Sequence, residues 1–317
     1  MRSKPPYWLL FLLTLLHGSG TTRISSLIFF DLAYDTPRGS SFNVTRTYLD
    51  IRSRTADDVT LRITSDVGRT REDDPLVLFL KHAYLSWNTS LGVLEAGVQP
   101  TNYFGPTKKT WGYRFVEKFP TDRVGFGATA DLGVSLRKEV FPRLNVHAAV
   151  YNGPGYKNQE NDSYKRVSVL LSYGEQELNR RPGWNTGGAV SYEPYEVPAS
   201  TDRQTKITAL LFGGYASTNF RIGGEYTILA DTGHDDRSLL GTTMSVRLRK
   251  ALSLWMRGEV YDPSTIAEND GELYLLAGLN FMPRPGLSVA PNLRYASGGT
   301  SSDGSDWMVK LNLEFRI

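Results

Sequence analysis

The residues that could carry acid–base or metal chemistry are few and scattered along the chain. None of its 317 residues is a cysteine, which excludes thiolate ligands, a cysteine nucleophile and disulfides. Its four histidines stand far apart, without the H-x-x-x-H spacing of a zinc helix. His147 is the one candidate for a catalyst at a rim, although a hydrogen-bonded wall histidine explains it more simply. We therefore predict no metal, no cofactor and no catalytic residue.

Basic residues are instead concentrated in residues 100–126. This segment has five cations and two acids, a local charge of +3, from Lys108, Lys109, Arg114, Lys118 and Arg123 against Glu117 and Asp122. Connections this long are uncommon and usually functional. We expect the segment to fold inward and narrow a passage, with Lys108, Lys109 and Arg114 near a permeating solute. The alternative is a basic external loop that binds lipopolysaccharide phosphate or stays solvated.

The N-terminus and the overall charge restrict where the chain acts. Arg2 and Lys4 precede an apolar run at 7–17 and then Gly18-Ser19-Gly20, which is the pattern of a secretory signal peptide. The run is shorter than the ~20 apolar residues that a membrane helix needs. The formal charge of +3 is too small for a nucleic-acid binder. We predict a signal peptide at 1–20, a single domain at 21–317 and no nucleic-acid partner.

The elements that would position these residues are β-strands. From residue 26 onward, apolar and polar residues alternate in short segments, and a period of two is that of a strand with one apolar face. In segment 306–317, for example, Leu311 and Leu313 share one face, while Asn312 and Glu314 share the other. We predict sixteen strands, at 26–34, 41–54, 57–68, 74–87, 90–99, 127–137, 142–152, 164–173, 184–193, 204–216, 218–229, 238–249, 252–262, 271–282, 285–296 and 306–317.

The links between these segments alternate in length, as in a membrane barrel with long loops at one end and short turns at the other. The ten-residue link 174–183 is the exception. A soluble β-sandwich would show the same alternation, but paired charges on the polar faces and aromatic residues near strand ends favour a barrel. The last strand ends Phe315-Arg316-Ile317 and resembles the signal that barrel-assembly machinery reads. We predict an all-β, transmembrane antiparallel barrel of sixteen strands, with segment 100–126 folded inward.

Charged residues on the polar faces would line the inside of such a barrel. There Arg and Lys outnumber Asp and Glu, although the whole chain is nearly balanced. The predicted lumen-wall residues are Arg46, Asp50, Arg62, Asp66, Lys81, Glu95, Asp131, Arg221, Glu225, Arg257 and Glu259. An excess of cations around a pore favours anions. Part of this charge can instead pair neighbouring strands, and we expect both roles.

Several stretches, taken in order, resemble the phosphate-selective porin O/P group of outer-membrane proteins. They cover roughly the first half of the mature chain and include Phe29-Phe30-Asp31, Trp111-Gly112-Tyr113-Arg114, Tyr151-Asn152-Gly153-Pro154-Gly155-Tyr156 and residues 42–50, 61–68, 80–87 and 130–134. The resemblance implies a sixteen-stranded channel that assembles as a homotrimer. Phosphate selectivity belongs to a few members and is not carried over to this chain.

Together these observations predict a bacterial outer-membrane porin, a water-filled channel for passive diffusion of small solutes with a preference for anions. The expected partners are outer-membrane lipid, lipopolysaccharide, the barrel-assembly machinery and small solutes or inorganic anions. The alternatives are an outer-membrane barrel enzyme and a secreted all-β binding protein.

Overall fold

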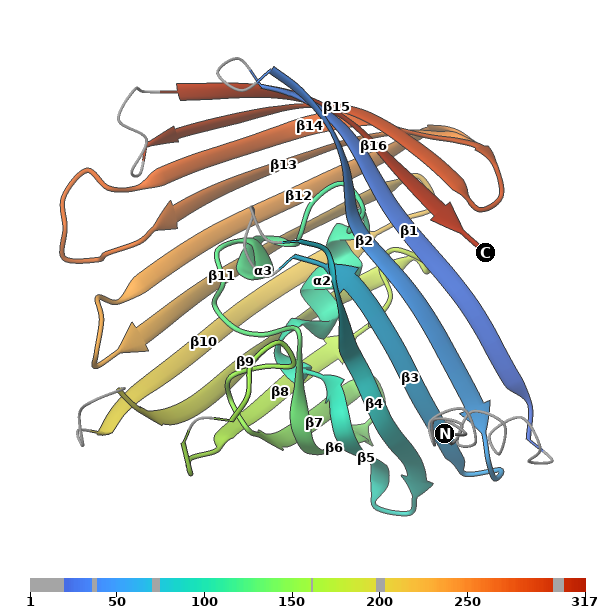
Figure 1. Cartoon of the computed structure of the whole chain (residues 1–317), viewed down its shortest axis with the longest axis vertical. Coiled ribbons are helices and arrows are strands. Elements are labelled where there is room, and N and C mark those ends of the chain that lie inside the picture. Colours follow the sequence, from blue (N-terminus) through green and yellow to red (C-terminus); the bar gives the residue numbers. More distant parts are fainter. Residues whose placement is uncertain (1–19, 36–38, 70–74, 161, 198–202, 299–304) are drawn as a thin grey trace, which may run out of the picture.

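A computed structural model describes residues 20–35, 39–69, 75–160, 162–197, 203–298 and 305–317. The signal peptide expected at 1–20 lies outside these residues, apart from Gly20. Sixteen antiparallel strands follow one another around a closed barrel, as predicted, and β1 pairs with β16 to close the ring (Figure 1). The strands are β1 (Thr22–Asp35), β2 (Gly39–Arg54), β3 (Val59–Gly68), β4 (Val77–Thr89), β5 (Gly92–Pro100), β6 (Ala130–Phe141), β7 (Leu144–Tyr151), β8 (Arg166–Gly174), β9 (Gly183–Glu196), β10 (Arg203–Ala216), β11 (Phe220–Asp231), β12 (Arg237–Arg249), β13 (Leu252–Asp262), β14 (Glu272–Arg284), β15 (Leu287–Gly298) and β16 (Ser305–Arg316).

The alternation of side chains decides which face of each strand is apolar. In β13, Met256 and Val260 are exposed on the outside, whereas Trp255, Arg257 and Glu259 are buried on the inside. Closing the sheet on itself gives each strand two neighbours and leaves no edge whose backbone groups lack partners. The result is an apolar outer surface around a polar lumen.

Strand β4 departs from simple alternation. Leu80 is exposed on the outside in the first half of the strand, and Leu85 is exposed on the outside in the second half. The phase changes because Lys81 and His82, which are adjacent, are both buried on the inside, where the pairing with β3 shifts by one residue. This bulge brings two titratable side chains to the same place on the lumen wall.

The two ends of the barrel differ in the length of their links. Short turns such as 90–91, 142–143 and 250–251 lie at the end where β1 begins and β16 ends. Longer links, among them 101–129 and 152–165, lie at the opposite end. The link 175–182, here called turn 175–182, belongs to the short-turn end but is eight residues long, as its sequence suggested.

The connection between β5 and β6, residues 101–129, enters the lumen, which confirms that the long basic segment folds inward. We call it the inner loop. It contains η1 (Asn102–Phe104), α2 (Gly105–Trp111) and α3 (Pro120–Arg123), and Figure 1 shows α2 and α3 inside the ring of strands. No helix in the described part of the chain is long and apolar enough to cross a membrane.

Candidate functional site

The first turn of the inner loop is fixed to the wall at β7 and β8. The side-chain amide of Asn102 donates to the backbone carbonyl of His147 over 2.7 Å, and Ser168 Oγ donates to Asn102 Oδ1 over 2.7 Å. The Asn102 backbone N–H donates to the Tyr151 hydroxyl over 3.0 Å. Because these groups are buried, leaving any of them unpaired would cost about 1–3 kcal/mol.

Ion pairs hold the later part of the inner loop against β13–β15. Glu117 lies 2.5 Å from Arg294. Arg123 lies 2.6 Å from Glu259 and 2.7 Å from Glu272. Glu117 and Arg123, which the sequence placed at a pore constriction, therefore anchor the loop to the wall instead of meeting open solvent.

Wall residues of β11 and β13 bind the same loop. Arg221 donates to the Trp111 carbonyl over 3.0 Å, and Glu225 accepts the Thr121 backbone N–H over 2.9 Å. Arg257 pairs with Glu259 and donates to the carbonyl of Lys118. A buried charge that loses its partner costs several kcal/mol, so these wall charges act chiefly as attachments for the loop.

Glycines hollow the wall where α2 and α3 rest. A Cβ at Gly223 of β11 would lie 2.2 Å from Thr110 Cγ2, and one at Gly241 of β12 would lie 2.8 Å from Pro120. Gly223 lies opposite Thr243, and Gly214 of β10 lies opposite Gly223. The loop can approach so closely only because these positions carry no side chain.

An aromatic and aliphatic cluster fills the space between the inner loop and this wall. Trp111 packs edge-on against Trp255 with ring centroids 5.6 Å apart. The buried members are Phe29, Tyr103, Phe104, Trp111, Phe115, Val116, Phe119, Leu170, Ala189, Leu210, Phe212, Trp255, Leu276 and Ala290. Burial of this much apolar surface stabilises the inward position of the loop.

The open part of the lumen lies on the other side of the inner loop, against the wall of β1–β4 and β16. A cavity of about 400 Å³ remains there. Six cations line it, against two acids, Asp50 and Glu314; the cations are Arg52, Arg62, Lys81, Lys108, Arg114 and Arg316. Six minus two leaves a formal surplus of four positive charges, with His82 counted as neutral. We call this space the cationic cavity.

Lys108 is the cation of this cavity that has no acid partner in the described chain. Arg52 and Arg62 share Asp50 at 2.8 and 2.7 Å. Arg114 pairs with Asp122 at 3.2 Å. Lys109, the neighbour of Lys108 on α2, turns away from the cavity and pairs with Glu177 of turn 175–182 at 2.9 Å.

The surroundings of Lys108 disfavour its charged form. Enclosure within the barrel lowers the pKa of its ammonium group below its usual value of 10.5, and the nearby charges of Lys81, Arg114 and Arg62 lower it further. The side chain is nevertheless exposed to the cavity, so water preserves part of its hydration. An anion that entered the cavity would meet an unpaired cation and relieve this repulsion.

A second group of wall charges lies beside the cavity, under the link 152–165. Asp66 lies 2.8 Å from Arg46 and 3.5 Å from Lys81, and it accepts the Tyr156 hydroxyl over 3.0 Å. Lys81 lies between the rings of Tyr48 and Tyr156, 4.9 and 5.2 Å from their centroids. The link thus contacts β3 and β4, and Asp66 neutralises part of the charge there.

The two remaining wall acids lie elsewhere on the lumen wall. Asp131 is buried and pairs with Arg166 at 3.5 Å. Glu95 is buried, and the structure shows no ion pair for it within the described residues. Neither acid lines the cationic cavity, so neither offsets its charge directly.

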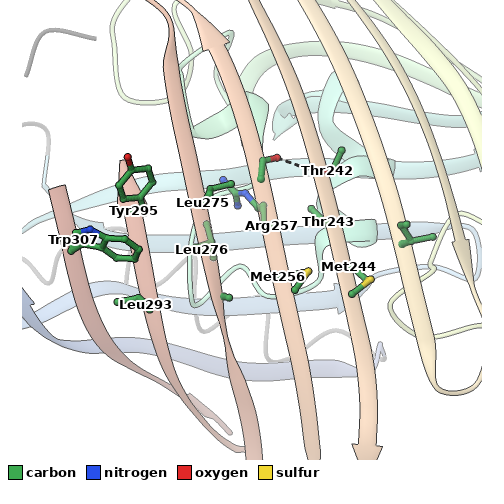
Figure 2. A pocket seen from close by; sticks show the side chains of 13 residues that line it. Thr242, Thr243, Met244, Met256, Arg257, Leu275, Leu276, Leu293, Tyr295 and Trp307 are labelled. Carbon is green, nitrogen blue, oxygen red and sulfur yellow. Dashed lines mark hydrogen bonds between the residues drawn. The ribbon is translucent and has the colours of Figure 1, made fainter. Parts of the chain in front are cut away.

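A larger groove, of about 630 Å³, lies on the opposite side of the sheet and is unrelated to the lumen. Figure 2 shows Met244, Met256, Leu293, Tyr295 and Trp307 along it, on β12, β13, β15 and β16. Most of these side chains are exposed apolar residues of the outer face. Among the described residues its lining is mainly apolar, and the one charged residue in it, Arg257, pairs with Glu259 on the lumen side.

Three residues in or near the site were not predicted from the sequence. His82 lines the cationic cavity because of the bulge in β4, Tyr156 of the link 152–165 contacts Asp66 and Lys81 beside the cavity, and Glu177 reaches α2 from turn 175–182. The paired glycines at 187–188, 213–214 and 223–224 were the one signal in the sequence for a hollowed wall. Within the described residues, no group of three or more His, Asp or Glu could hold a metal ion.

No family model matches the chain, and no curated protein matches it in sequence. Solved structures do match. The outer membrane channel DcaP of Acinetobacter baumannii aligns with a TM-score of 0.67 and 13% identity, over 94% of this chain and 97% of that one. The anion-selective porin from Comamonas acidovorans aligns with a TM-score of 0.65 and 10% identity, over 94% and 100%. The trimer form of OmpT, an outer membrane protein of Vibrio cholerae, aligns with a TM-score of 0.64 and 13% identity, over 94% of this chain and 99% of that one. These likenesses show that the chain has the closed sixteen-stranded antiparallel barrel fold of outer-membrane porins.

Proposed function

We propose that the protein is an outer-membrane channel through which small solutes diffuse passively, and that it favours anions. The observation that carries this proposal is the cationic cavity, where six cations face two acids beside the inner loop. A single charge about 4 Å from an ion contributes ~1 kcal/mol in bulk water, and more where the dielectric constant is lower. The formal surplus of four charges falls to two when Asp66 beside Lys81 and Asp122 beside Arg114 are counted, and this is still enough to bias permeation.

The proposal also covers export, insertion into the outer membrane, assembly and the site of the constriction. Residues 1–20 direct export and residues 21–317 form the barrel domain, which the barrel-assembly machinery inserts among outer-membrane lipid and lipopolysaccharide. A homotrimer is proposed because OmpT of Vibrio cholerae is described in a trimer form. The channel performs no chemistry and needs no cofactor; the gradient of the solute drives transport. The constriction is assigned to Lys108 and Arg114 on the inner loop and to Arg62 and Lys81 on the wall.

Three measurements test the proposal in sequence. The mature protein, folded in detergent, is expected to migrate differently on a gel before and after heating, as membrane barrels do. It is then expected to conduct in a planar bilayer, and liposomes that contain it are expected to admit small carboxylates faster than sugars of similar size. A heat-modifiable protein without conductance would overturn the channel, and a compact monomer that dissolves without detergent would overturn the membrane barrel.

A further inference from the structure

Turn 175–182 folds into the barrel instead of simply joining β8 to β9. Leu178 at its centre is only 3% exposed. The turn is internally braced, because the backbone N–H groups of Arg180 and Arg181 donate to the Glu177 carbonyl over 2.8 and 2.9 Å. The side-chain amide of Asn185 also donates to the Glu175 carbonyl over 2.8 Å. The turn is therefore a shaped element with an apolar residue turned into the lumen.

This element contacts α2, the helix that carries Lys108. Glu177 lies 2.9 Å from Lys109, which is the single ion pair of α2 within the described residues. Leu178 and Thr110 both lie over Gly214 of β10, where an added Cβ would lie 2.8 Å from Leu178 and 3.1 Å from Thr110. A seven-residue helix is too short to be stable alone, so contacts of this kind determine where α2 lies.

We propose that turn 175–182 is a latch that holds α2 from the short-turn end, with Glu177 and Leu178 as positioning residues for Lys108. Leu178 fixes the helix by packing. Glu177 fixes it by pairing with Lys109 and also neutralises Lys109, so that Lys108 remains the unpaired cation of α2. The inference rests on the proposed channel function, because the position of Lys108 has consequences only if solutes pass it.

The two residues predict different electrical effects. Leu178→Ala loosens the latch without changing charge, so single channels should visit conductance substates several-fold more often at unchanged ion selectivity. Glu177→Gln should add such substates and also increase anion preference, because it frees the charge of Lys109. Exchanging the pair, with Lys109→Glu and Glu177→Lys, should restore steady channels. Glu139→Gln, at another short turn, is the matched control and should behave as wild type.

A second readout does not depend on conduction. The chain has no cysteine, and a Cβ at Gly105 of α2 would meet nothing within 4 Å, so a nitroxide attached through Gly105→Cys should report helix motion without disturbing contacts. We expect a more mobile spectrum with Leu178→Ala and with Glu177→Gln, and no change with Glu139→Gln. Unchanged spectra in both latch variants, with steady channels of wild-type selectivity, would overturn the latch. A protein that conducts nothing while these variants mobilise the label would overturn the channel and leave the latch standing as a structural contact.

Discussion

At the scale of residues, Lys108 and Lys109 are adjacent in sequence but have different surroundings. Lys109 is paired with Glu177, whereas Lys108 faces the cationic cavity without an acid partner in the described chain. We predict that Lys108→Gln lowers the ratio of anion to cation permeability several-fold, since it removes a charge worth ~1 kcal/mol or more to a nearby ion. Lys109→Gln frees the negative charge of Glu177 but should lower the ratio much less, because neither residue lines the cavity. Zero-current potentials of the two variants test this; equal effects would contradict the assignment.

The lowered pKa of Lys108 predicts a pH dependence. Because the pKa lies below the usual 10.5, the lysine should lose its charge at a lower pH than an ordinary lysine, and anion preference should fall as pH rises through that value. Zero-current potentials recorded from pH 6 to pH 10 should show this decline in wild type. Lys108→Arg keeps its charge throughout and should make the decline clearly smaller. If Lys108→Arg shows the same decline, another group titrates.

Glu117 predicts a loss of stability in acid. Burial raises the pKa of this carboxyl, but Arg294 and Arg257 outweigh it and lower the pKa to about 2, below its usual 4.5. A lowered pKa means that the ionised group stabilises the fold above about pH 4.5, and that this contribution is lost as pH falls toward 2. In Glu117→Gln, the thermal midpoint from tryptophan fluorescence should be lower at pH 7 and should change less between pH 5 and pH 3 than in wild type. If the thermal midpoints of Glu117→Gln and wild type fell equally between pH 5 and pH 3, this prediction would be contradicted.

At the scale of elements, the sequence predicted the repeating strands but did not predict contacts between residues far apart in the chain. Alternation, which is strict in segments such as β11 and β13, together with the turn-like links between segments predicted sixteen strands and the faces of Arg221, Arg257 and Glu259, because the period of a strand is a local property. The facing of β4 could not be assigned, since the bulge at Lys81 and His82 inverts the phase within one apolar run.

The inner loop shows the same limit. Its length and basic charge predicted that it folds inward, but its partners come from distant strands and turns, in some cases more than a hundred residues away, such as Glu225 for Thr121. Which of its charges would remain unpaired depended on those partners. Lys108, Lys109, Arg114, Lys118 and Arg123 therefore looked alike in the sequence.

The glycine hollow predicts a difference between two neighbouring residues. Gly223 faces inward under Thr110, whereas Gly224 is exposed on the outer face. Gly223→Val should displace α2 and change the single-channel conductance, at a cost of ~1–3 kcal/mol for overpacking. Gly224→Val is the matched control and should leave conductance unchanged. The hollow would not be needed to seat α2 if the two variants conduct alike.

At the scale of the whole molecule, the barrel has two surfaces of opposite polarity, an apolar outer face and a charged lumen. The outer face is apolar along every strand and includes the groove at Met244 and Met256. The inner loop packs through an aromatic cluster on one side and borders the cationic cavity on the other. In the proposed channel, lipid covers the outer face and ions pass through the lumen beside the inner loop.

The central claim is that solutes cross beside the inner loop past a surplus of positive charge. The most direct test is the zero-current potential of the wild-type protein across a planar bilayer that separates unequal KCl concentrations. The account predicts a conducting channel whose potential has the sign of chloride permeation and moves toward zero in Lys108→Gln. A potential with the sign of potassium permeation, from a protein that conducts, would contradict it.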